Sequence, residues 1–581
     1  MSGVSPLETA IRKFVLPGMH LHFASTPSRS NAAVRELGRC FRRSNPRFSI
    51  SASGFHSTLH LLVRLGLARS YLACFFGDNY PVPRPNRLYQ GLEGGLGKTI
   101  HVLSLLSYVE ALRAGAMAQP FAVTRSLLGT DMGRDLERAG YFFEHVSLDT
   151  AADTGASAAA TFGLVKAIRP DVTFVHALLA DAAGNVVVSA PHSEGFWAAN
   201  GARRGVIVTV ERLATTAELR EFRDAMPIAR HQVLAVCEVP GGAHPQPVFA
   251  EPRFGVAGYE DDFAHYLLWR RLATDDSLFA EFERLVLDAP HGEAGYSAFK
   301  RAVADGSFGP QSAPPAAAGP DAAPATLSPD QEALFVAAAR AICRKVKAKD
   351  YKVVIAGIGG SFYAARLAKI WLARERVDVD VIVETGLAGV ACGAEGHDFL
   401  LSHRNTARSE RLSNVEDALG VLCVAGERCL GVIGAAEVDA RGNINSTRSA
   451  SGQFLVGSGG ANDIASRCAE VIVTVRCDAR RLVEKVAYVT SPGDRVTEVV
   501  TDRCTFSRDH AQATWSVSAL ISAENGQSRA EVIDEICKRC PWRCTTDTLS
   551  DALPISAQER RDLDAIHPVP LPDPSGPEQR S

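Results

Sequence analysis

The chain has 581 residues, of which 46% are hydrophobic and 22% are charged, and this balance excludes disorder as its main state. The length is enough for two or more domains with sizeable cores. Because 62 lysine and arginine residues are matched by 65 aspartate and glutamate residues, the net charge of -3 gives no global positive field, and we expect neither nucleic acid nor a membrane as a partner.

The N-terminal stretch MSGVSPLETAIRKFVLPGMH lacks the basic start and the uninterrupted apolar core of a secretory signal. No later stretch is apolar over the roughly twenty residues that a membrane span needs. The 13 cysteines are scattered and mostly lie in apolar surroundings, which is typical of reduced thiols. We therefore expect a soluble, cytoplasmic protein.

The first candidate anion-binding loop along the chain is GLEGGLGKT, residues 91–99. It ends in Gly-Lys-Thr like a phosphate-binding P-loop, but that motif needs a glycine where this chain has Leu92. The preceding residues, NRLYQ, do not read as a buried strand. We therefore do not expect a nucleoside triphosphatase.

Short apolar strands alternate with helical stretches in both halves of the chain. DVTFVHALLA follows TFGLVKAIRP, and VVIAGI precedes SFYAARLAKIWLARERV. This alternation predicts an α/β fold with two open domains and largely parallel sheets. Between the halves, GPQSAPPAAAGPDAAPATLSPD has almost no large apolar residue, as expected of an extended Pro/Ala-rich linker. We place the domains at 1–308 and 331–555, the linker at 309–330 and a C-terminal tail at 556–581.

A short pattern occurs once in each half. VHALLADAAGNVVVS at 175–189 and VIGAAEVDARGNINS at 432–446 each consist of an apolar strand, the sequence D-x-x-G-N and a second short strand. Asp and Gly in these positions suit a tight turn in which Gly184 and Gly442 adopt a positive φ. The repetition suggests two related modules, as in two subunits fused into one polypeptide.

The strand that begins at Ile355 ends in a glycine turn, and a helix follows that Ser361 could cap. Such a turn leaves backbone N–H groups free to bind a ligand. The small residues of the turn are Gly357, Gly359 and Gly360. A dinucleotide fingerprint is excluded because its third glycine would fall at Phe362. A strand-to-helix turn without a ligand explains the glycines equally well, but the next strand leads to Glu384, and neighbouring parallel strands share one crevice at their carboxyl ends.

Glu384 lies in VIVETGLAG, residues 381–389, directly after three β-branched apolar residues. A carboxylate at the end of a strand can be a helix cap, a salt-bridge partner, a general base or a nucleophile. The following residues, Thr385 and Gly386, place nothing bulky beside it. The residue type alone leaves all four roles open.

The third glycine-rich stretch is GSGGANDIAS, residues 457–466. Small residues let the backbone approach a ligand closely, and successive N–H groups of such a turn can bind an oxyanion. The candidates are Gly457, Ser458, Gly459, Gly460, Ala461 and Asn462. A simple turn before a helix is the alternative.

Two further groups of residues resemble metal or catalytic sites. Cys537, Cys540 and Cys544 form a C-x2-C-x3-C run, but no fourth zinc ligand follows at a matching spacing. We favour an amphipathic helix there and predict no metal site. His176 lies in an apolar strand, which favours a hydrogen-bonded core histidine over a catalytic base.

The second half, through VIVETGLAG, IGAAEVDARGNINST, GSGGANDIAS and KVAYVTSPG, resembles the β subunit of family I CoA-transferases of the glutaconate CoA-transferase type. The first half resembles the α subunit through VEALRAGAMAQPFAVTRSLLGTDM, PDVTFVHALLADAAGN, RRGVIVTVE and GGAHP. The resemblance implies the α/β fold of that family, with both subunits fused in one chain. A homodimer or higher homo-oligomer is expected, since most oligomers are symmetric.

The resemblance also implies a mechanism, because the E-x-G motif assigns the nucleophilic glutamate of the family to Glu384. CoA would pass from an acyl-CoA to a carboxylic acid through a glutamyl-CoA thioester, with CoA as a substrate and no permanently bound cofactor. The small residues of the stretches 357–360 and 457–462, together with Gly386, would bind CoA or stabilise the oxyanions. Asn79 and Tyr80 lie on a loop, FFGDNYPVPRPN, that could reach the acyl group.

Two alternatives remain at this stage. The AGAMAQPF and RSLLGTDM segments are closer to divergent relatives that hydrolyse, decarboxylate or cleave carbon–carbon bonds of CoA thioesters. A protein that binds CoA thioesters without catalysis would keep the glycine loops and would not need the carboxylate.

Overall fold

The computed structural model of the chain describes most residues. These are 3–25, 28–92, 99–149, 159–309, 327–392, 396–397, 399–424, 427–509, 514–521, 528–546, 549–551 and 553–566. Most of the GLEGGLGKT stretch, most of the predicted linker and the end of the predicted tail lie outside the described residues.

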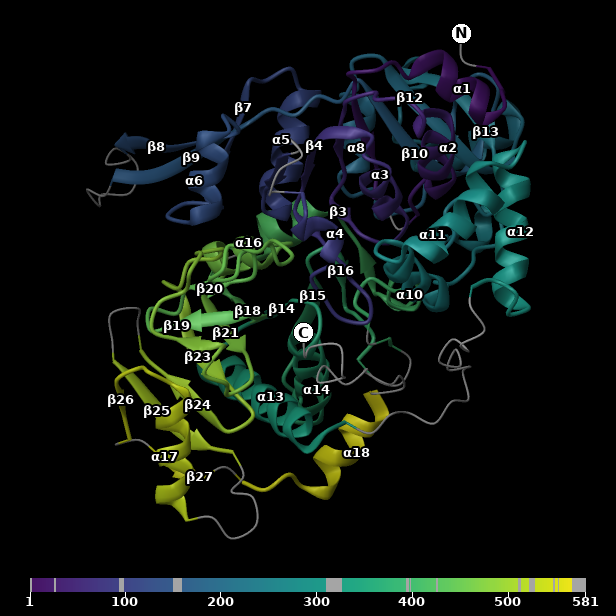
Figure 1. The fold of residues 1–581 in the computed structure, drawn as a ribbon. Helices are drawn as coiled ribbons and strands as arrows, with labels where there is room; N and C mark the ends of the chain where they lie inside the picture. Colours follow the sequence, from purple (N-terminus) through teal and green to yellow (C-terminus); the bar gives the residue numbers. More distant parts are fainter. Residues whose placement is uncertain are drawn as a thin grey trace.

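The first half is built on a parallel sheet with the strand order β13-β12-β10-β1-β2-β4-β6, and the short strand β11 pairs antiparallel with β10 (Figure 1). The strands are β1 (His20–Phe23), β2 (Phe48–Ser51), β4 (Ala68–Ala73), β6 (Thr99–Val102), β10 (Val172–Ala180), β11 (Val186–Val187), β12 (Gly205–Leu213) and β13 (Val233–Glu238). Every residue of β10 is buried, as expected of a central strand covered on both faces.

The second half is built on a mixed sheet with the strand order β17-β16-β15-β14-β18-β21-β23-β24-β25-β26, and β27 also pairs with β25. The strands from β15 to β23 in this order are parallel, and the outer strands add antiparallel pairs. The strands are β14 (Val353–Ala356), β15 (Asp380–Val383), β16 (Leu387–Ala388), β17 (Arg411–Leu412), β18 (Cys429–Gly434), β21 (Glu470–Thr474), β23 (Val496–Val500), β24 (Cys504–Ser507), β25 (Trp515–Leu520), β26 (Cys544–Thr545) and β27 (Ser550–Asp551).

The two sheets are wound in the same way. Each begins with a strand in its middle, β1 or β14, and places the next strand, β2 or β15, on one side. The later strands, β10 and β12 or β18 and β21, are added on the other side. The predicted α/β class with largely parallel sheets is confirmed.

The predicted D-x-x-G-N turns are confirmed and nearly identical in geometry. Oδ1 of Asp181, and likewise Oδ1 of Asp439, accepts hydrogen bonds from the amides two and four residues further on, at 2.9 to 3.0 Å. Gly184 has a φ of 88° and Gly442 a φ of 84°, the region that favours glycine.

Helices cover the faces of both sheets. In the first half they are α1 (Leu7–Phe14), α2 (Asn31–Phe41), α3 (His60–Arg64), α4 (Arg87–Gln90), α5 (Leu105–Ala116), α6 (Asp131–Arg138), α8 (Gly195–Asn200), α9 (Thr216–Leu219), α10 (Phe263–Leu272), α11 (Asp276–Phe282) and α12 (Gly292–Ala304). In the second half they are α13 (Pro329–Lys349), α14 (Gly360–Arg374), α15 (His403–Arg408), α16 (Ala461–Arg467), α17 (Arg529–Arg539) and α18 (Ala557–Ile566).

Local sequence signals explain where several helices begin. Ser328 and Gln331 form a capping box at the start of α13, where Pro329 occupies the first helical position. Ser104 and Ser107 form a similar reciprocal pair at the start of α5. These caps satisfy backbone N–H groups that have no partner within the helix, and they define its first residue.

Small additional sheets extend the two halves. They pair β3 (Gly54–Phe55) with β5 (Phe75–Phe76), β9 (Ala159–Lys166) with β7 (Phe121–Thr124) and β8 (Phe142–Asp149), and β19 (Glu437–Asp439) with β20 (Ile444–Asn445) and β22 (Leu482–Val483). Figure 1 shows β7, β8 and β9 beside α6, projecting from the body of the molecule.

One hydrophobic core runs through both halves. It contains Leu106 and Leu112 of α5 together with Ile433 of β18 and Ile464 of α16, all at most 1% exposed. The two halves therefore share an apolar interior, which is accompanied by buried polar contacts such as that between Ser126 and Asp463. Such an interface resembles an obligate one.

The segment assigned to the tail begins with an ordered helix. Leu563 and Ile566 of α18 are buried in the same core as α13 and α14, and Arg374 forms an ion pair with Asp562. The first part of this segment therefore belongs to the second half.

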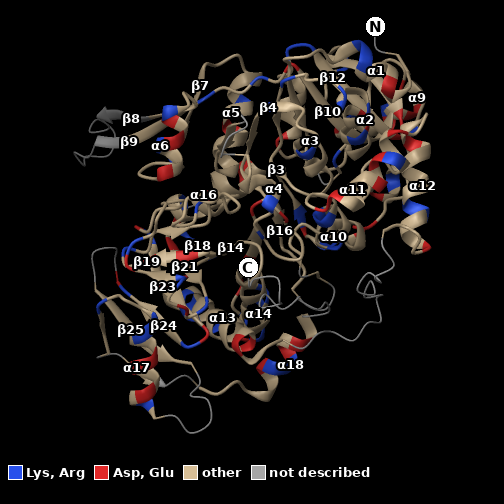
Figure 2. Cartoon of the chain, in the orientation of Figure 1, with Lys and Arg blue, Asp and Glu red and all other residues tan. Residues whose placement is uncertain are grey.

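Charged residues of both signs are interspersed over the described elements, and neither sign gathers on one side in the view of Figure 2. In the part of the chain that the structure describes, we find no helix with the length and apolarity that crossing a membrane requires.

Candidate active site

Glu384 lies at the tip of a β-hairpin. β15 ends at Val383, and the amide of Gly386 donates to the Val383 carbonyl at 3.0 Å, which closes a tight turn through Glu384 and Thr385. Gly386 has a φ of 100°, and a Cβ atom on it would lie 2.1 Å from the Ser413 carbonyl oxygen. Glycine is therefore required at this position by the turn and by close packing against Ser413.

The carboxylate of Glu384 contacts the third glycine loop. The amide of Gly460 donates to Oε2 of Glu384 at 2.8 Å. A Cβ atom on Gly460 would lie 2.3 Å from the same oxygen, so any side chain there would displace the carboxylate. The structure thus brings together two residues that the sequence predicted for one site.

Burial controls the charge of this carboxylate. Desolvation raises the pKa of Glu384 to about 7, the Gly460 amide opposes the shift, and the charge of Asp463 adds to it. Among the described residues, no lysine or arginine forms an ion pair with Glu384. The hypothesis of a strand-end salt bridge therefore receives no support from these residues.

The other N–H groups of the glycine loop are already hydrogen-bonded. Ser458 and Gly459 both donate to the carbonyl of Cys74, at 3.1 and 3.0 Å. Gly457 donates to the Ser446 carbonyl, and the next two amides after Gly460 donate to the carbonyl and hydroxyl oxygens of Ser458. Of the loop amides predicted to bind an oxyanion, only that of Gly460 is aimed at Glu384.

The start of α16 is fastened to the first half. Oδ1 of Asn462 accepts a hydrogen bond from the Leu127 amide at 2.9 Å. Asp463 is fully buried, and its two carboxylate oxygens accept from the Leu106 amide at 2.9 Å and from the Ser126 hydroxyl at 2.6 Å. The position of Gly460, and with it that of Glu384, therefore depends on both halves of the chain.

The glycine turn that follows β14, residues 357–360, lies beside Glu384 at the carboxyl edge of the sheet. In the register of β14 and β15 the last pair is Ala356 with Val383, so that Gly357 and Glu384 follow side by side. Gly359, with a φ of 91°, precedes α14 and provides no side-chain cap. The amides of Phe362 and Tyr363 donate to the Gly359 carbonyl at 2.9 and 3.2 Å, which leaves the amides of Gly360 and Ser361 as candidate donors at this helix start.

The prediction that Ser361 caps α14 is wrong. Ser361 lies inside the first turn, and its hydroxyl contacts that of Thr474 at 3.0 Å. Gly360 is also a packing residue, because a Cβ atom on it would lie 2.8 Å from the ring of Phe335. Glycine is therefore explained at these positions by the turn and by the packing of α13 against α14, whether or not a ligand binds there.

Asn79 and Tyr80 lie on a partly buried loop between the halves. The ring of Tyr80 stacks on Phe263 at 4.3 Å and meets Phe399 of the second half edge-on at 5.4 Å. Val82, two residues further on, lies 4.0 Å from where a Cβ atom on Gly359 would be. The loop thus reaches the start of α14, and the Asn79 side chain is buried in it.

The comparisons with known proteins agree with this arrangement. Residues 4–230 match the family model described as Coenzyme A transferase. The chain is 29% identical over 248 residues to one of the subunits of 3-oxoadipate CoA-transferase from Pseudomonas knackmussii, an alignment that covers 42% of this chain and 79% of that protein. It is also 29% identical over 227 residues to another subunit of the same enzyme. That alignment covers 35% of this chain and 80% of the related subunit. The first half of the chain thus matches the coenzyme A transferase model, and the chain is similar in sequence to two subunits of a CoA-transferase.

A solved structure extends the likeness to the whole chain. An acyl-CoA transferase from E. coli O157:H7, determined as a thioester complex with CoA, superimposes with a TM-score of 0.63 and 16% identity, covering 98% of each chain. At this identity the match concerns the fold alone. A CoA-transferase fold therefore spans both halves of this chain.

Asp463 is the functional candidate that sequence reasoning missed, although it follows directly after the predicted residues. Its burial and its charge beside Glu384 are visible only once α16 is placed against Leu106 and Ser126. The Cys74 carbonyl accepts hydrogen bonds from two amides of the glycine loop. The sequence could not predict this contact, because every residue has a backbone carbonyl.

The interpretation of His176 is confirmed. Its ring is buried and hydrogen-bonded to Thr209 at 2.9 Å and to Glu211 at 2.7 Å. The cysteine run begins on the predicted helix, α17, where Cys537 is exposed, and continues past its end with the buried Cys540.

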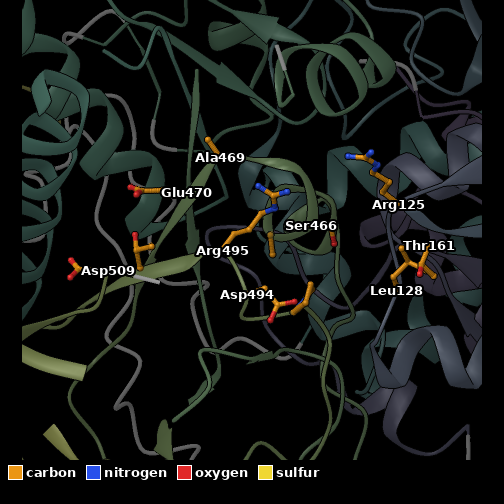
Figure 3. A pocket seen from close by; sticks show the side chains of 12 residues that line it. Arg125, Leu128, Thr161, Ser466, Ala469, Glu470, Asp494, Arg495 and Asp509 are labelled. Atoms are coloured by element: carbon orange, nitrogen blue, oxygen red, sulfur yellow. The ribbon is translucent and has the colours of Figure 1, made fainter. Parts of the chain in front are cut away.

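A separate cavity of about 540 Å³ lies between the halves near the C-terminal end of α16. Figure 3 shows Arg125 and Thr161 of the first half on one side and Arg495 and Asp494 of the second half opposite. Glu384 does not line it, and its mixed charges point to no single class of ligand.

Proposed function

We propose that this chain transfers CoA from an acyl-CoA to a carboxylic acid through a thioester on Glu384. The observation that carries this proposal is the position of Glu384 at a hairpin tip, desolvated, with the Gly460 amide 2.8 Å from Oε2. Support for the substrate class comes from the relatives, which are named as CoA-transferase subunits.

In the first step a carboxylate oxygen of Glu384 attacks the thioester carbonyl, the carbon–sulfur bond breaks, and CoA leaves as the thiolate. The product is a mixed anhydride between the acyl group and Glu384. The thiolate then attacks the glutamyl carbonyl, the carbon–oxygen bond of the anhydride breaks, and the first carboxylic acid leaves as its carboxylate. A second acid reverses both steps, which restores Glu384 and forms the new acyl-CoA.

The surroundings suit these steps. A carboxylate with a pKa near 7 is less stabilised by solvent than an exposed one and is a better nucleophile, while a useful fraction stays ionised at neutral pH. The Gly460 amide already bonds the oxygen that becomes the oxyanion when the thiolate attacks the glutamyl carbonyl. The uncapped start of α14 offers N–H donors for the oxyanion of the substrate carbonyl.

We further propose that the chain combines two subunits in one polypeptide, joined by the segment 309–330. The separate likeness to two different subunits of one enzyme supports this, as do the two sheets with the same winding. A linker keeps two partners at high effective concentration.

The proposed function is tested by incubating the protein with an acyl-CoA and a second carboxylic acid and measuring the new acyl-CoA. Transfer should depend on the acceptor acid and should fall at least about 10⁴-fold in Glu384→Gln, because the amide cannot form the anhydride. Release of CoA at the same rate without an acceptor would instead indicate hydrolysis. Full activity of Glu384→Gln would overturn the covalent mechanism.

A further inference from the structure

Three cysteine side chains from separate segments of the second half meet in its core. Cys423 follows the π-helical segment Glu416–Leu422, Cys429 is the first residue of β18, and Cys468 comes directly after α16. Their sulfur atoms all lie within 4.8 Å of one another, and Sγ of Cys468 is 3.8 Å from Sγ of Cys429. The proposed CoA transfer gives this thiol cluster no role.

The thiol cluster differs from two other buried cysteines of the chain. Cys74 and Cys343 are buried singly, and each thiol donates to a backbone carbonyl at 3.7 Å. A single buried cysteine of this kind packs as a small apolar residue. In the thiol cluster the side chain of Cys468 contacts another sulfur atom instead. Sulfur atoms that converge from several segments are the arrangement that thiolate metal sites use.

The spacing of the sulfur atoms suits coordination of one metal ion. Thiolates bind Zn²⁺ at about 2.3 Å, which in a tetrahedral site places neighbouring sulfur atoms about 3.8 Å apart. The sulfur atoms of Cys429 and Cys468 are already separated by 3.8 Å, and that of Cys423 lies within 4.8 Å of both. Small side-chain movements would therefore bring all three sulfur atoms to bonding distance from one ion.

Burial determines which ions the cluster could hold. All three cysteine side chains are 0% exposed and lie in the hydrophobic core together with Ile464 and Val471. Ions that require oxygen ligands, such as Mg²⁺ and Ca²⁺, are excluded from such surroundings. Soft thiolate ligands select Cu⁺ or Zn²⁺.

Gly431 brings the segments of the cluster close together. It lies on β18 two residues after Cys429, and a Cβ atom on it would be 2.5 Å from the Ile464 side chain and 3.3 Å from Sγ of Cys468. A larger residue would push the end of α16 away from β18. Because this position is glycine, side chains from α16 and β18 can share one ligand.

Arg467 offsets the charge that metal binding would create. The three thiols would lose their protons to solvent, so that Zn²⁺ with three thiolates carries one negative charge in excess. Arg467 lies within electrostatic reach of Cys423 and donates from Nη2 to the Gly420 carbonyl at 2.9 Å, while its Nε is buried and has no hydrogen-bond partner. The guanidinium beside the cluster would make the occupied site neutral.

We propose that Cys423, Cys429 and Cys468 form a structural site for a thiophilic metal ion with a filled d shell, either Zn²⁺ or Cu⁺. The charge balance with Arg467 favours Zn²⁺, and the ligand number of three favours Cu⁺. Both ions share the thiolate chemistry, and they are separate arms of the test. The inference does not depend on the proposed CoA transfer.

The site would hold α16 at the end opposite to the active site. The helix starts directly after Gly460, whose amide contacts Glu384, and it ends at Arg467, about 10 Å further along its axis. Leu106 and Ser126 hold the start of the helix, and the metal ion would tie its end to β18. Because the cluster is buried, the ion would enter while the chain folds, and its binding would contribute to folding.

The test measures the metal content of the full chain, purified from cells grown in zinc-supplemented or in copper-supplemented medium. Inductively coupled plasma mass spectrometry should find about one ion per chain in at least one preparation, because a buried thiolate site keeps its ion through purification. A content below about a tenth of an ion per chain in both preparations would overturn the inference.

Variants assign the ion to the thiol cluster. The double variant Cys429→Ala/Cys468→Ala leaves one thiol in the cluster and should lower the metal content at least about tenfold. Cys237→Ala/Cys343→Ala removes two buried thiols outside the cluster and serves as the matched control, which should keep the ion. Undiminished metal in the first double variant would contradict the proposal.

Two measurements on the wild-type chain do not depend on the folding of a variant. X-ray absorption at the edge of the bound metal should show three sulfur neighbours at about 2.3 Å. A shell of nitrogen and oxygen atoms without sulfur would overturn the inference. The metal-loaded chain should also unfold at a higher temperature than chain from metal-depleted medium. Equal unfolding midpoints would contradict a structural role of the ion.

Discussion

The two halves of this chain place different chemistry at the same edge of similarly wound sheets. After β15 in the second half comes a carboxylate with a raised pKa and one backbone donor, and after β1 in the first half comes a buried guanidinium beside unpaired hydroxyl groups. The sheet supplies only the position, because in both halves these charged groups lie on the loops that follow the strands. The same architecture thus carries a carboxylate in one half and a guanidinium in the other.

Neither edge is complete within its own half. The glycine loop that orders Glu384 bonds the carbonyl of Cys74, and α16 is held by Leu106 and Ser126, all from the first half. The Tyr80 loop of the first half contacts Phe399 of the second. Variants that change the contacts between the halves therefore test whether each edge depends on the other half.

Among variants that keep the Glu384 carboxylate, the largest effect is expected from Gly460→Ala. The added Cβ atom would lie 2.3 Å from Oε2 of Glu384 and would force the carboxylate away from its position. A displacement of about 1 Å is enough to lower kcat/KM by about 100-fold or more. Gly91→Ala is the matched control, because nothing lies within 4 Å of the atom it adds. Unchanged transfer in Gly460→Ala would show that this contact does not matter.

A smaller effect concerns stability. The folded pKa of Glu384, about 7, is above its unfolded value, so the wild-type chain loses stability as the pH rises from about 4.5 to 7. Glu384→Gln does not titrate and should be more stable at pH 8 by about 3 kcal/mol, with little difference at pH 4. Thermal unfolding at both pH values measures this. A lower midpoint for the variant at pH 8 would argue that the carboxylate stabilises the fold.

Asp463→Asn should change the pH profile more than the maximal rate. The kcat/KM of the wild-type chain should rise with pH around a midpoint near 7, where Glu384 becomes ionised. Removing the charge of Asp463 lowers the pKa of Glu384, so the profile should move to lower pH. Asp494→Asn removes a carboxylate that lines the separate cavity, which Glu384 does not line, so its profile should stay in place. Identical profiles for all three chains would exclude the electrostatic role of Asp463.

The smallest effect is expected from cutting the linker. A protease site inserted within 310–326 and then cleaved should leave the halves associated, because they share a hydrophobic core. Transfer activity should change by less than about twofold, and the two fragments should elute together in size-exclusion chromatography. The uncleaved variant is the control. Separation of the fragments would show that the linker, and not the shared core, keeps the halves together.

Several features could be predicted from the sequence because they rest on local patterns. The alternation of strands and helices indicates the fold class, and the apolar run before Glu384 places the carboxylate at the carboxyl edge of a sheet. The D-x-x-G-N turns follow from the side chain of Asp and the backbone freedom of Gly. These features involve residues close together in the sequence.

Other features depend on contacts between residues far apart and could not be predicted. Glycine composition indicates that a loop can bind an anion, but not that the amides of Ser458 and Gly459 already bond Cys74. The role of Gly386 is decided by the Ser413 carbonyl, which approaches it from another segment. Arg29 shows no special pattern in the sequence, and its complete burial, with Nη1 unbonded, is visible only in the structure.

The central claim is that Glu384 carries CoA covalently. The most direct measurement is mass spectrometry of the wild-type chain after incubation with an acyl-CoA and then with hydroxylamine, which attacks the glutamyl carbonyl and releases the CoA thiol. The account predicts a hydroxamate on the peptide that contains Glu384, formed only when the acyl-CoA is present. Turnover of the same acyl-CoA with Glu384 unmodified, or with the hydroxamate on a different residue, would contradict it.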